Sequence, residues 1–536
     1  MGTRITAMET DVLIVGAGPT GLMLANQLAR RGVRPVIIDR HAGPAQQSRA
    51  MAVQARTLEI YAKMGVIEKS MALGTRATAA NMWASGRWTA RIPIGDIGKD
   101  LSPYPFVLML GQDDNERIMG AALGELGVEV EWSTELVAFQ QHPDRVDATL
   151  RLADGSTRKV AARWLAGCDG AHSPVREMSG IGFPGAPYEH TFFVADTEAT
   201  GPMRPGELNV YLWADGFHLF FPMRGRDRWR VIGILPPALR QKADLTFAEV
   251  VPAIRQEAGS ALRFPECFWF STYRIHHRAA ERFRDRRCFL LGDAAHIHSP
   301  AGAQGMNTGL QDAYNLAWKL ALIVQGRAEA ALLDSYEQER IPVAQQLLKT
   351  TDRAFQVIVA DGWFGALFRT KIMARMAALA MRFERVRRLA FRTISQIGIR
   401  YPASTLSQNE AGLPADAPAA GDRFPWVRLK LDAGGQPADL FEALDDTRFN
   451  LLVFGQPAPP AISAFDGLLQ VHTIPSDAVN AAELARSRVP QASFYLLRPD
   501  GHVGLCGPRL DQRAVESYLT QRLHLRRCGV ASMPAS

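Results

Sequence analysis

Three glycines near the N-terminus have the spacing that lets a phosphate group approach the backbone. Gly16, Gly18 and Gly21 form a G-x-G-x-x-G pattern between an apolar, strand-like run and a helical repeat of apolar residues. In such a turn the first glycine permits the tight bend, the second admits a pyrophosphate, and the third lets helix and strand pack closely. Asp39 ends the next apolar run, where its carboxylate can accept hydrogen bonds from a ribose. Residues 11–40 therefore predict a dinucleotide site at a helix N-terminus, for NAD or for FAD.

A second strand-to-helix turn contains Asp169 and Gly170. Apolar residues 164–166 precede it, Ser173 is placed to cap a helix, and Pro174 suits the first helical position. Taken alone, this segment is equally well an ordinary loop.

A third turn is richer in glycine and follows another buried apolar run. Gly292 and Asp293 end that run, Gly302 and Gly305 lie in the loop, and the apolar repeat predicts a helix over 310–325. An acid at the carboxyl end of a strand can hold a ribose or polyol hydroxyl. Because side chains are sparse ahead of the helix, its first N–H groups can stabilise an anionic ligand. One dinucleotide turn and two further loops can thus line a single long cofactor.

The three turns, in this order, resemble the G-x-G-x-x-G, D-G and G-D motifs of the FAD-dependent aromatic hydroxylases. These are the single-component (class A) flavoprotein monooxygenases of the p-hydroxybenzoate hydroxylase superfamily. The resemblance covers about residues 10–400 and is closest to the longer members, the phenol, 3-(3-hydroxyphenyl)propionate and polyketide hydroxylases with a thioredoxin-like C-terminal domain. It implies hydroxylation of a phenolic or other aromatic substrate with NADH or NADPH and O2, through a C4a-hydroperoxyflavin.

The resemblance also assigns residues to the cofactor. It implies that Arg49 reaches the phosphates and the flavin region, and that Gln112 touches FAD just ahead of a helix. Asp169 would lie near both FAD and NAD(P)H, and Asp293 would bind the ribityl chain. Asp39 departs slightly from the pattern, since Glu is more usual there. The complete set assigned to FAD is Gly16, Ala17, Gly18, Pro19, Thr20, Gly21, Asp39, Arg40, Arg49, Gln112, Asp169, Gly292, Asp293, Gly302, Gly305, Met306 and Asn307.

The segment 183–283 changes to an alternating pattern that predicts hairpins, and we expect a substrate-binding sheet there. Tyr211 and Trp213 share one strand parity, and Phe220 shares the parity of His218. Tyr211, Trp213 and Phe220 are therefore candidates for an aromatic wall of the substrate pocket. The alternative is that they belong to the core or to the outer face of the sheet.

Two residues are candidates for the reaction itself. His218 is the group in this hairpin that titrates near neutral pH, so it could take a phenol proton, although ordinary packing is the alternative. By resemblance, Pro300 aligns with a proline whose carbonyl lies near the substrate hydroxyl. The loop 302–307 would lie against the flavin ring, with the following helix start stabilising reduced, anionic flavin.

We expect an α/β fold with a discontinuous Rossmann-like FAD-binding domain, residues 1–182 and 284–400, whose last part, 327–400, is helical. A β-sheet substrate domain would occupy 183–283, and a thioredoxin-like domain 421–525. Without a C-x-x-C motif the tail cannot do dithiol chemistry, so packing or dimerisation is its expected role.

The composition fits an ordinary soluble protein. The chain has 536 residues, 47% of them hydrophobic, a net charge of +7 and five cysteines without close pairs. This pattern suits the cytoplasm and argues against a zinc site or a disulfide scaffold. We interpret the arginine-rich segment 375–392 as a solvated helix face rather than a membrane or nucleic-acid surface. The expected partners are a small aromatic substrate, O2 and NAD(P)H, without nucleic acid or membrane, in a possible homodimer.

Three other functions remain open at this level. A flavin dehydrogenase or reductase would share the FAD loops without oxygen chemistry. The aromatic substrate could be a polycyclic polyketide rather than a small phenol. A non-enzymatic flavin-binding protein belongs to a different class and would show no turnover of NAD(P)H.

Overall fold

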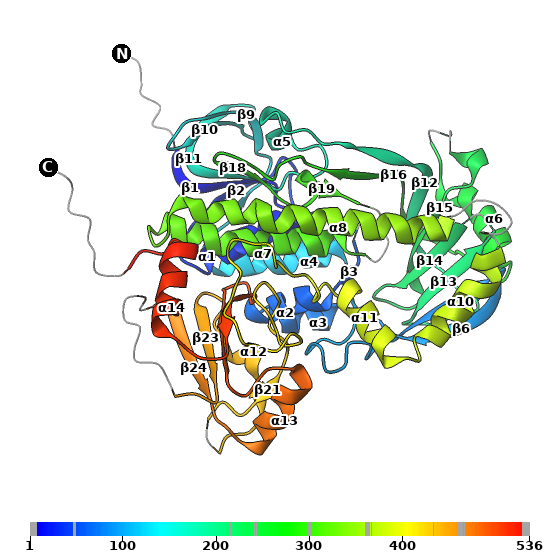
Figure 1. Cartoon of the computed structure of the whole chain (residues 1–536). Helices are drawn as coiled ribbons and strands as arrows, with labels where there is room; N and C mark the ends of the chain where they lie inside the picture. The colour runs from blue at the N-terminus through cyan, green and yellow to red at the C-terminus, as the bar shows by residue number, and fades with distance from the viewer. Residues whose placement is uncertain are drawn as a thin grey trace, which may run out of the picture.

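The computed structural model describes residues 8–46, 50–214, 216–240, 242, 244–298, 303–359, 365, 367–432, 434–457, 465 and 467–527. Within this part of the chain, two eight-stranded sheets, a five-stranded sheet and two smaller ones are joined by helices. Figure 1 shows the first sheet at the upper left, the second at the right and the C-terminal sheet at the lower left. The mixed α/β fold expected from the sequence is confirmed.

The first sheet is largely parallel and places the three glycine turns at the carboxyl ends of its strands. Its central strand β1 (Met8–Val15) pairs in parallel with β11 (Thr157–Gly167) and β2 (Val36–Ile38). The second half of β1, residues 12–15, is buried, as expected for a parallel strand with both faces covered. The remaining strands are β8 (Val130–Glu131), β9 (Glu135–Gln141), β10 (Val146–Arg151), β17 (Arg284–Asp285) and β18 (Cys288–Leu290).

Long helices connect the first sheet with the rest of the molecule. α1 (Pro19–Ala29) packs against α7 (Gly305–Val324), and α8 (Asp334–Val359) runs beside α7 across the molecule (Figure 1). α7 begins at Gly305 rather than at 310, because Thr308 N already donates to Gln304 O at 2.9 Å. Among the described helices, none has the length and apolar character that a membrane crossing requires. The neighbouring elements are α2 (Ala55–Lys63), α3 (Ile67–Leu73), α4 (Gln112–Glu125), α5 (Pro174–Met178), η2 (Gly292–Ala294), β3 (Ala52–Val53), β4 (Thr75–Arg76) and β7 (Leu108–Met109).

The second sheet is mainly antiparallel and has helices on both faces. One face packs against α6 (Phe247–Ala258), and the other packs against α10 (Ala374–Ala380), which α11 (Glu384–Ile394) follows. Two of its strands, β5 (Ala79–Ala84) and β6 (Arg87–Pro93), come from the part of the sequence that we expected in the FAD-binding domain. The others are β12 (Gly185–Glu198), β13 (Leu208–Trp213), β14 (Gly216–Pro222), β15 (Arg228–Ile234), β16 (Cys267–Ala279) and β19 (His296–Ile297).

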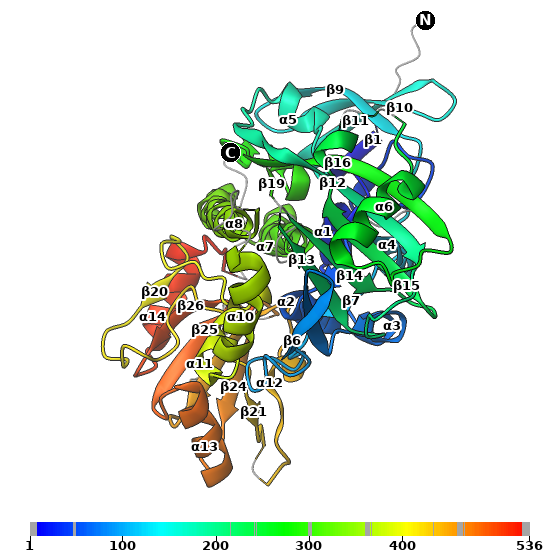
Figure 2. The same cartoon turned by 90° about the vertical axis from the view of Figure 1, so that its right-hand side faces the viewer.

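The C-terminal sheet shares a core with the rest of the chain. In its strand β23 (Phe449–Phe454) one parity joins the core around the first sheet and α7, and the other faces a separate C-terminal cluster. The Trp318 ring of α7 meets the Phe449 ring edge-on at 5.8 Å. Figure 2 shows α7 and α8 nearly end-on between this sheet and the first one. The further elements are β20 (Gln408–Asn409), β21 (Arg428–Leu429), β22 (Ala438–Asp439), α12 (Leu440–Ala443), β24 (Leu469–Ile474), α13 (Ala478–Ser487), β25 (Ser493–Leu497), β26 (Val503–Gly507) and α14 (Gln512–Ser517).

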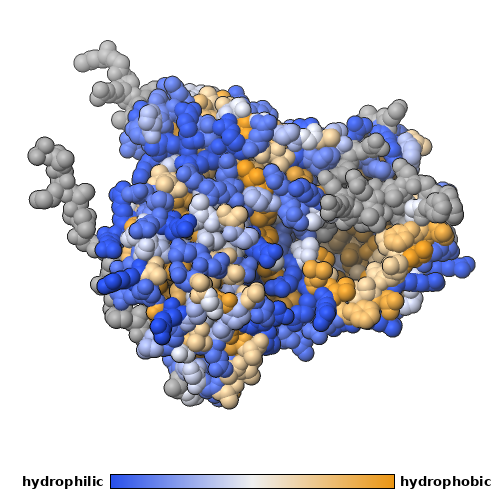
Figure 3. Space-filling model, in the orientation of Figure 1, coloured by the Kyte–Doolittle hydropathy of each residue, from blue (hydrophilic) through white to orange (hydrophobic). Residues whose placement is uncertain are grey.

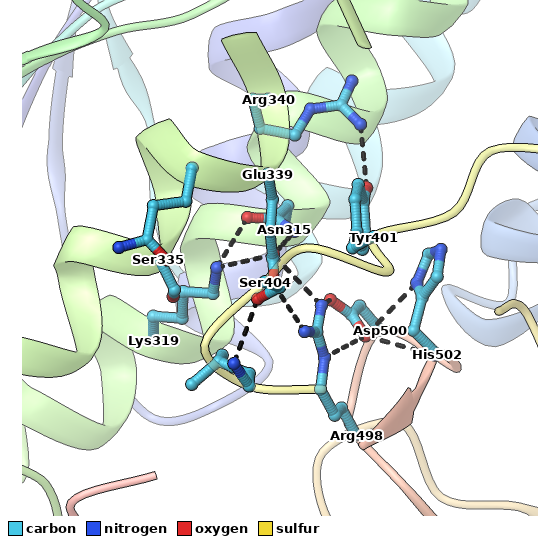
Figure 4. A network of polar contacts seen from close by, with 12 residues as sticks. Asn315, Lys319, Ser335, Glu339, Arg340, Tyr401, Ser404, Arg498, Asp500 and His502 are labelled. Atoms are coloured by element: carbon cyan, nitrogen blue, oxygen red, sulfur yellow. Dashed lines mark hydrogen bonds and ion pairs between the residues drawn. The ribbon is translucent and has the colours of Figure 1, made fainter. Parts of the chain in front are cut away.

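A buried network of charges also ties the C-terminal sheet to α7 and α8 (Figure 4). At its centre, Glu339 accepts from Lys319 Nζ at 2.9 Å and from Arg498 Nη1 at 2.5 Å. Arg498 also pairs with Asp500, and Ser404 donates to Glu339 at 2.6 Å. Because these charged side chains are almost wholly buried, each needs the others to balance its loss of hydration. The C-terminal part is therefore packed into the body of the molecule rather than appended to it.

Candidate functional site

In the first glycine turn, two glycines are closely packed against neighbouring backbone and the third faces open space. A Cβ at Gly16, whose φ is +104°, would lie 2.3 Å from Cys168 O, and one at Gly21 would lie 1.9 Å from Gly16 O. A Cβ at Gly18 would meet no atom of the described residues within 4 Å. Within the described structure no side chain caps the start of α1. The turn therefore presents unobstructed backbone N–H groups to an open space, as a pyrophosphate needs.

Asp39 stands directly beside this turn. Its Oδ2 accepts from Ala17 N at 2.8 Å, and its Oδ1 accepts from His41 N at 2.9 Å. The Asp39 carboxylate is partly exposed, and the neighbouring Arg40 is exposed. These contacts fix the carboxylate at the edge of the open space while leaving it acceptor capacity for a ribose.

The D-G turn packs against the first turn. Asp169 Oδ2 accepts from Val175 N at 2.9 Å, and Ser173 caps α5 by accepting from Arg176 N, as the sequence predicts. Asp169 Oδ1 is buried and has no hydrogen-bond partner among the described residues. Burial raises the pKa of Asp169. An unsatisfied carboxylate oxygen is costly unless a ligand satisfies it, so this atom marks a place for a donor group.

The G-D turn meets the same site at Thr20. A Cβ at Gly292 would lie 2.6 Å from Thr20 Oγ1, and one at Gly309 would lie 2.5 Å from it. These two glycines therefore allow α1 and α7 to approach each other. Asp293 is exposed although Gly292 and Ala294 on either side of it are buried. The side chain thus points out of the packed turn, as a ligand contact requires.

The start of α7 is a second uncapped helix end. Its N-cap residue is Gln304, and the described structure shows no side-chain cap there. Met306 is half-buried, and the Asn307 side chain is fully buried. Asn307 Oδ1 accepts from Gln54 N at 2.9 Å and from Thr57 Oγ1 at 2.8 Å. The Asn307 side chain is therefore engaged in holding α2, and a contact with FAD would come from its backbone.

The remaining predicted cofactor residues lie nearby or outside the described structure. Gln112 begins α4, where its N–H donates to Ala50 O at 2.9 Å and its side chain donates to Glu116 at 2.9 Å. It therefore lies next to the segment that follows Arg49. The predictions for Arg49, Pro300 and Gly302 fall on residues outside the described part of the chain.

Sequence reasoning missed two residues that fix the G-D turn. Asp312 Oδ2 accepts from Gly292 N at 3.0 Å and contacts His296 Nε2 at 2.7 Å. Arg340 Nε donates to Asp312 Oδ1 at 2.6 Å, and Arg340 Nη2 donates to Thr308 O in the first turn of α7. Although burial alone would raise the pKa of Asp312, the Arg340 guanidinium and His296 hold it below its usual value. Only Asp312 had a local signal, because it is an acid inside the largely apolar repeat of α7; Arg340 stands in a polar stretch of α8 and had none.

The structure corrects the expected aromatic wall. Tyr211 and Phe220 are almost wholly buried in the core that α6 covers, and the half-buried Trp213 stacks on His218 with ring centroids 5.9 Å apart. His218 is fully buried, and its Nε2 contacts Glu257 Oε2 of α6 at 2.6 Å. These side chains therefore serve the packing of the sheet against α6. Tyr211, Phe220 and His218 do lie on one face of the sheet, but that face packs against α6.

On the opposite parity of β14, Phe217 and Leu219 pack toward α10, whereas Phe221, near the strand end, faces the loop that precedes α7. Phe221 and Met223, just beyond the strand, join an apolar cluster that contains Met51 and Met109, and Ala303 packs against the same cluster. Since Ala303 belongs to the loop that precedes α7, this cluster lies next to the second uncapped helix start. Its partly buried members Phe221, Met223 and Ala303 provide apolar surface beside the site, backed by the buried Met51 and Met109.

These features together fit FAD. The two uncapped helix starts suit a pyrophosphate and a flavin ring edge, Asp39 suits a ribose, and Asp293 suits the polyol between them. The unsatisfied Asp169 oxygen can accept a further hydrogen bond from the group.

Comparison with known proteins identifies the family. Residues 9–351 match the family model described as the FAD binding domain, so the chain belongs to that family. It is 34% identical to 6-methylpretetramide 4-monooxygenase of Streptomyces rimosus over 96% of this chain and 94% of that protein. Pentachlorophenol 4-monooxygenase of Sphingobium chlorophenolicum is 31% identical over 92% of this chain and 86% of its own length. The structure of aklavinone-11 hydroxylase with FAD and aklavinone superposes with a TM-score of 0.80 at 26% identity, covering 98% and 100% of the two chains.

The protein is accordingly an FAD-dependent monooxygenase of the aromatic-hydroxylase class. The resemblance found in the sequence and the assignment of FAD are confirmed. A flavin dehydrogenase and a non-enzymatic flavin protein are not supported by these relatives.

Proposed function

We propose that this monooxygenase uses NADH or NADPH and O2 to hydroxylate the phenolic ring of an apolar, fused-ring aromatic compound. Bound FAD supplies the redox chemistry that activates oxygen. The protein holds FAD, positions the substrate ring and excludes water. The observation that carries the proposal is the apolar cluster of Met51, Met109, Phe221 and Met223 beside Ala303.

The methionines favour a large, flat substrate. Unbranched methionine side chains adapt to the shape of a bound aromatic surface, and their sulfur makes favourable contacts with rings. A polycyclic substrate is also consistent with the relatives, one of which is named for 6-methylpretetramide and another for aklavinone. A small phenol is the second candidate, because another relative is named for pentachlorophenol.

The roles of individual residues are part of the proposal. The turns at Gly18 and Asp39 hold the ADP half of FAD, and Asp169 and Asp293 hold the flavin half. We keep the carbonyl of Pro300 as a candidate for the substrate hydroxyl. We do not retain His218 as the base, because Glu257 engages it beneath α6.

The proposal extends to the domain organisation of the chain. We propose an FAD-binding domain of residues 1–182 and 284–400, a substrate domain that adds β5 and β6 to 183–283, and a thioredoxin-like domain over 421–525. The order β24-β23-β25-β26, parallel then twice antiparallel, supports the thioredoxin-like topology. We further propose a cytoplasmic enzyme that can form a homodimer.

A substrate panel tests the function. Purified protein loaded with FAD would be given NADH or NADPH with tetracyclic phenols and with single-ring phenols. We expect oxygen uptake and a product heavier by one oxygen atom for the fused-ring compounds. Substrate oxidation without incorporation of labelled O2 would contradict the proposal.

Two adjacent residues test the substrate surface. Phe221→Ala should raise KM about tenfold and lower the product formed per NAD(P)H consumed, because the ring loses its apolar contact. Phe220→Ala, on the α6 side, should instead cost about 3–5 kcal/mol of stability and leave KM unchanged. Steady-state kinetics and thermal unfolding distinguish the two. Equal effects of both variants on KM would refute the assignment of faces.

A further inference from the structure

One region of the surface exposes more large apolar side chains than the rest. Eight of the fifteen exposed large hydrophobic residues in the described structure lie within 367–394. Leu389 is 68% exposed, Phe383 62% and Met376 57%. Figure 3 shows apolar surface gathered at the lower right, where Figure 1 places α10 and α11. Single exposed hydrophobics need no explanation, whereas a contiguous group indicates a contact surface.

These side chains cannot turn inward, because the inner sides of the same helices are already filled. Met373, Ala377 and Met381 pack against the second sheet, and Phe391 of α11 is buried beside Ile397. The helices are thus apolar on the inner side and partly apolar on the outer side. A helix that is apolar all round is normally covered on all sides.

The charge of the same region indicates what covers it. Residues 371–394 contain seven Lys or Arg residues and a single acid, Glu384. Arg388 approaches Glu384 at 3.4 Å, and Arg387 donates to two backbone carbonyls. Within the described structure no carboxylate pairs with the exposed set Lys371, Arg375, Arg382, Arg385 and Arg392. The partner must therefore supply negative charge around an apolar centre.

We propose that the outer face of α10 and α11, defined by Met376, Leu379, Phe383, Val386 and Leu389 with their flanking arginines, docks on an anionic lipid bilayer surface. Apolar side chains would enter the boundary between headgroups and acyl chains, while arginines bind lipid phosphates. This inference revises the expectation of a solvated helix face.

A second copy of the chain fits this face less well. In an isologous dimer each patch faces itself, so two strongly basic surfaces would meet with one acid on each side. A nucleic acid would use the arginines, but it has no use for the exposed Leu and Phe side chains at the centre. An anionic bilayer can accommodate both the exposed apolar side chains and the arginines around them.

Vesicle flotation of the FAD-loaded enzyme tests the proposal. We expect binding to vesicles of phosphatidylcholine mixed with phosphatidylglycerol and little binding to pure phosphatidylcholine. Raising the salt to about 0.5 M should weaken the binding, because surface charges are then screened. Absence of binding to the anionic vesicles would overturn the proposal.

Paired variants locate the surface. Phe383→Ser with Leu389→Ser should reduce the affinity for anionic vesicles about tenfold, and Arg382→Gln with Arg385→Gln should do so as well. The control pairs are Val471→Ser with Val479→Ser, also exposed apolar residues, and Arg226→Gln with Arg513→Gln, also exposed arginines. These controls should bind as the parent does. FAD content and circular dichroism verify the fold of each protein.

The other occupants give distinct results. Sedimentation velocity that shows a dimer, broken by Phe383→Ser with Leu389→Ser in the absence of vesicle binding, would replace the bilayer with a second copy. Salt-sensitive binding of a DNA duplex without vesicle binding would replace it with nucleic acid. Equal loss of vesicle binding in the control pairs would also overturn the assignment, because the affinity would then not belong to this face.

Discussion

At the residue scale, the glycines of the first turn serve two different purposes. Gly21 is required by packing, because a Cβ there would lie 1.9 Å from Gly16 O. Gly18 has ordinary extended dihedral angles, φ −69° and ψ −176°, and its Cβ would meet nothing within 4 Å among the described residues. The chain itself therefore tolerates a side chain at position 18, and the requirement for glycine there comes from the ligand.

Gly18→Ala should leave the apoprotein's melting temperature unchanged but raise the FAD dissociation constant about tenfold, because the methyl group occupies space meant for the pyrophosphate. Gly21→Ala should lower the melting temperature of the apoprotein, because α1 must move away from β1. Thermal unfolding without FAD and fluorescence titration with FAD measure the two effects. Unchanged FAD affinity in a folded Gly18→Ala protein would show that the turn does not bind the cofactor.

The same scale shows where a sequence stops being informative. The sequence grouped Tyr211 with Trp213 and Phe220 with His218 by parity, and in the structure Tyr211 and His218 are cross-strand partners. Parity could not tell which face meets the substrate, because α6 and α10 cover both faces and both parities are apolar. The face of the sheet that meets the substrate therefore depends on tertiary packing, which strand periodicity does not encode.

At the element scale, the glycine turns were predictable because each repeats a local format of strand, turn and helix. The buried apolar run expected ahead of Gly292 and Asp293 forms strand β18, Cys288–Leu290. The anchor of that turn was not predictable, since Arg340 reaches Asp312 from another helix. Such long-range pairing depends on how α7 and α8 pack, and that information is spread over the whole core.

Asp312→Asn should loosen the G-D turn while keeping the size of the side chain. The amide is a weaker acceptor for Gly292 N–H and leaves Arg340 buried without its carboxylate, which costs about 3–5 kcal/mol. We expect the FAD dissociation constant to rise about tenfold. Leu316→Ala, also on α7 and fully buried, is the control, since it costs about 2–5 kcal/mol without touching the turn. Similar loss of FAD affinity in both variants would mean that Asp312 acts only through general stability.

At the scale of the whole molecule, the C-terminal part completes the core rather than standing apart. The sequence marked it as a separate block from its own run of strands and helices. Two residues of the turn between β25 and β26 contact the long helices. Arg498 donates to the Glu339 carboxylate of α8, and Asp500 accepts from the Trp318 indole of α7. Removing this block would leave Glu339 without Arg498, and the Trp318 indole without Asp500, in a newly exposed surface. Its role in stability follows from this network.

Acid unfolding should report this network through Glu339. Although burial alone would raise its pKa, Arg498 and Lys319 lower the pKa of Glu339 from 4.5 to about 2. Because the folded-state pKa lies below the unfolded value, the carboxylate contributes its full stability above about pH 4.5 and loses it as the pH falls toward 2. The contribution is on the order of 3 kcal/mol at neutral pH.

Glu339→Gln should therefore lower the free energy of unfolding at pH 7 by about 3–5 kcal/mol, because two buried cations lose their carboxylate. The difference from the parent should shrink steadily as the pH falls below about 4.5, since protonation removes the same charge from the parent. Glu384→Gln, at an exposed pair with Arg388, should change the stability by less than about 1 kcal/mol at every pH. Urea unfolding at a series of pH values measures all three proteins. Parallel curves for the parent and Glu339→Gln would show that Glu339 does not link α8 to the C-terminal sheet electrostatically.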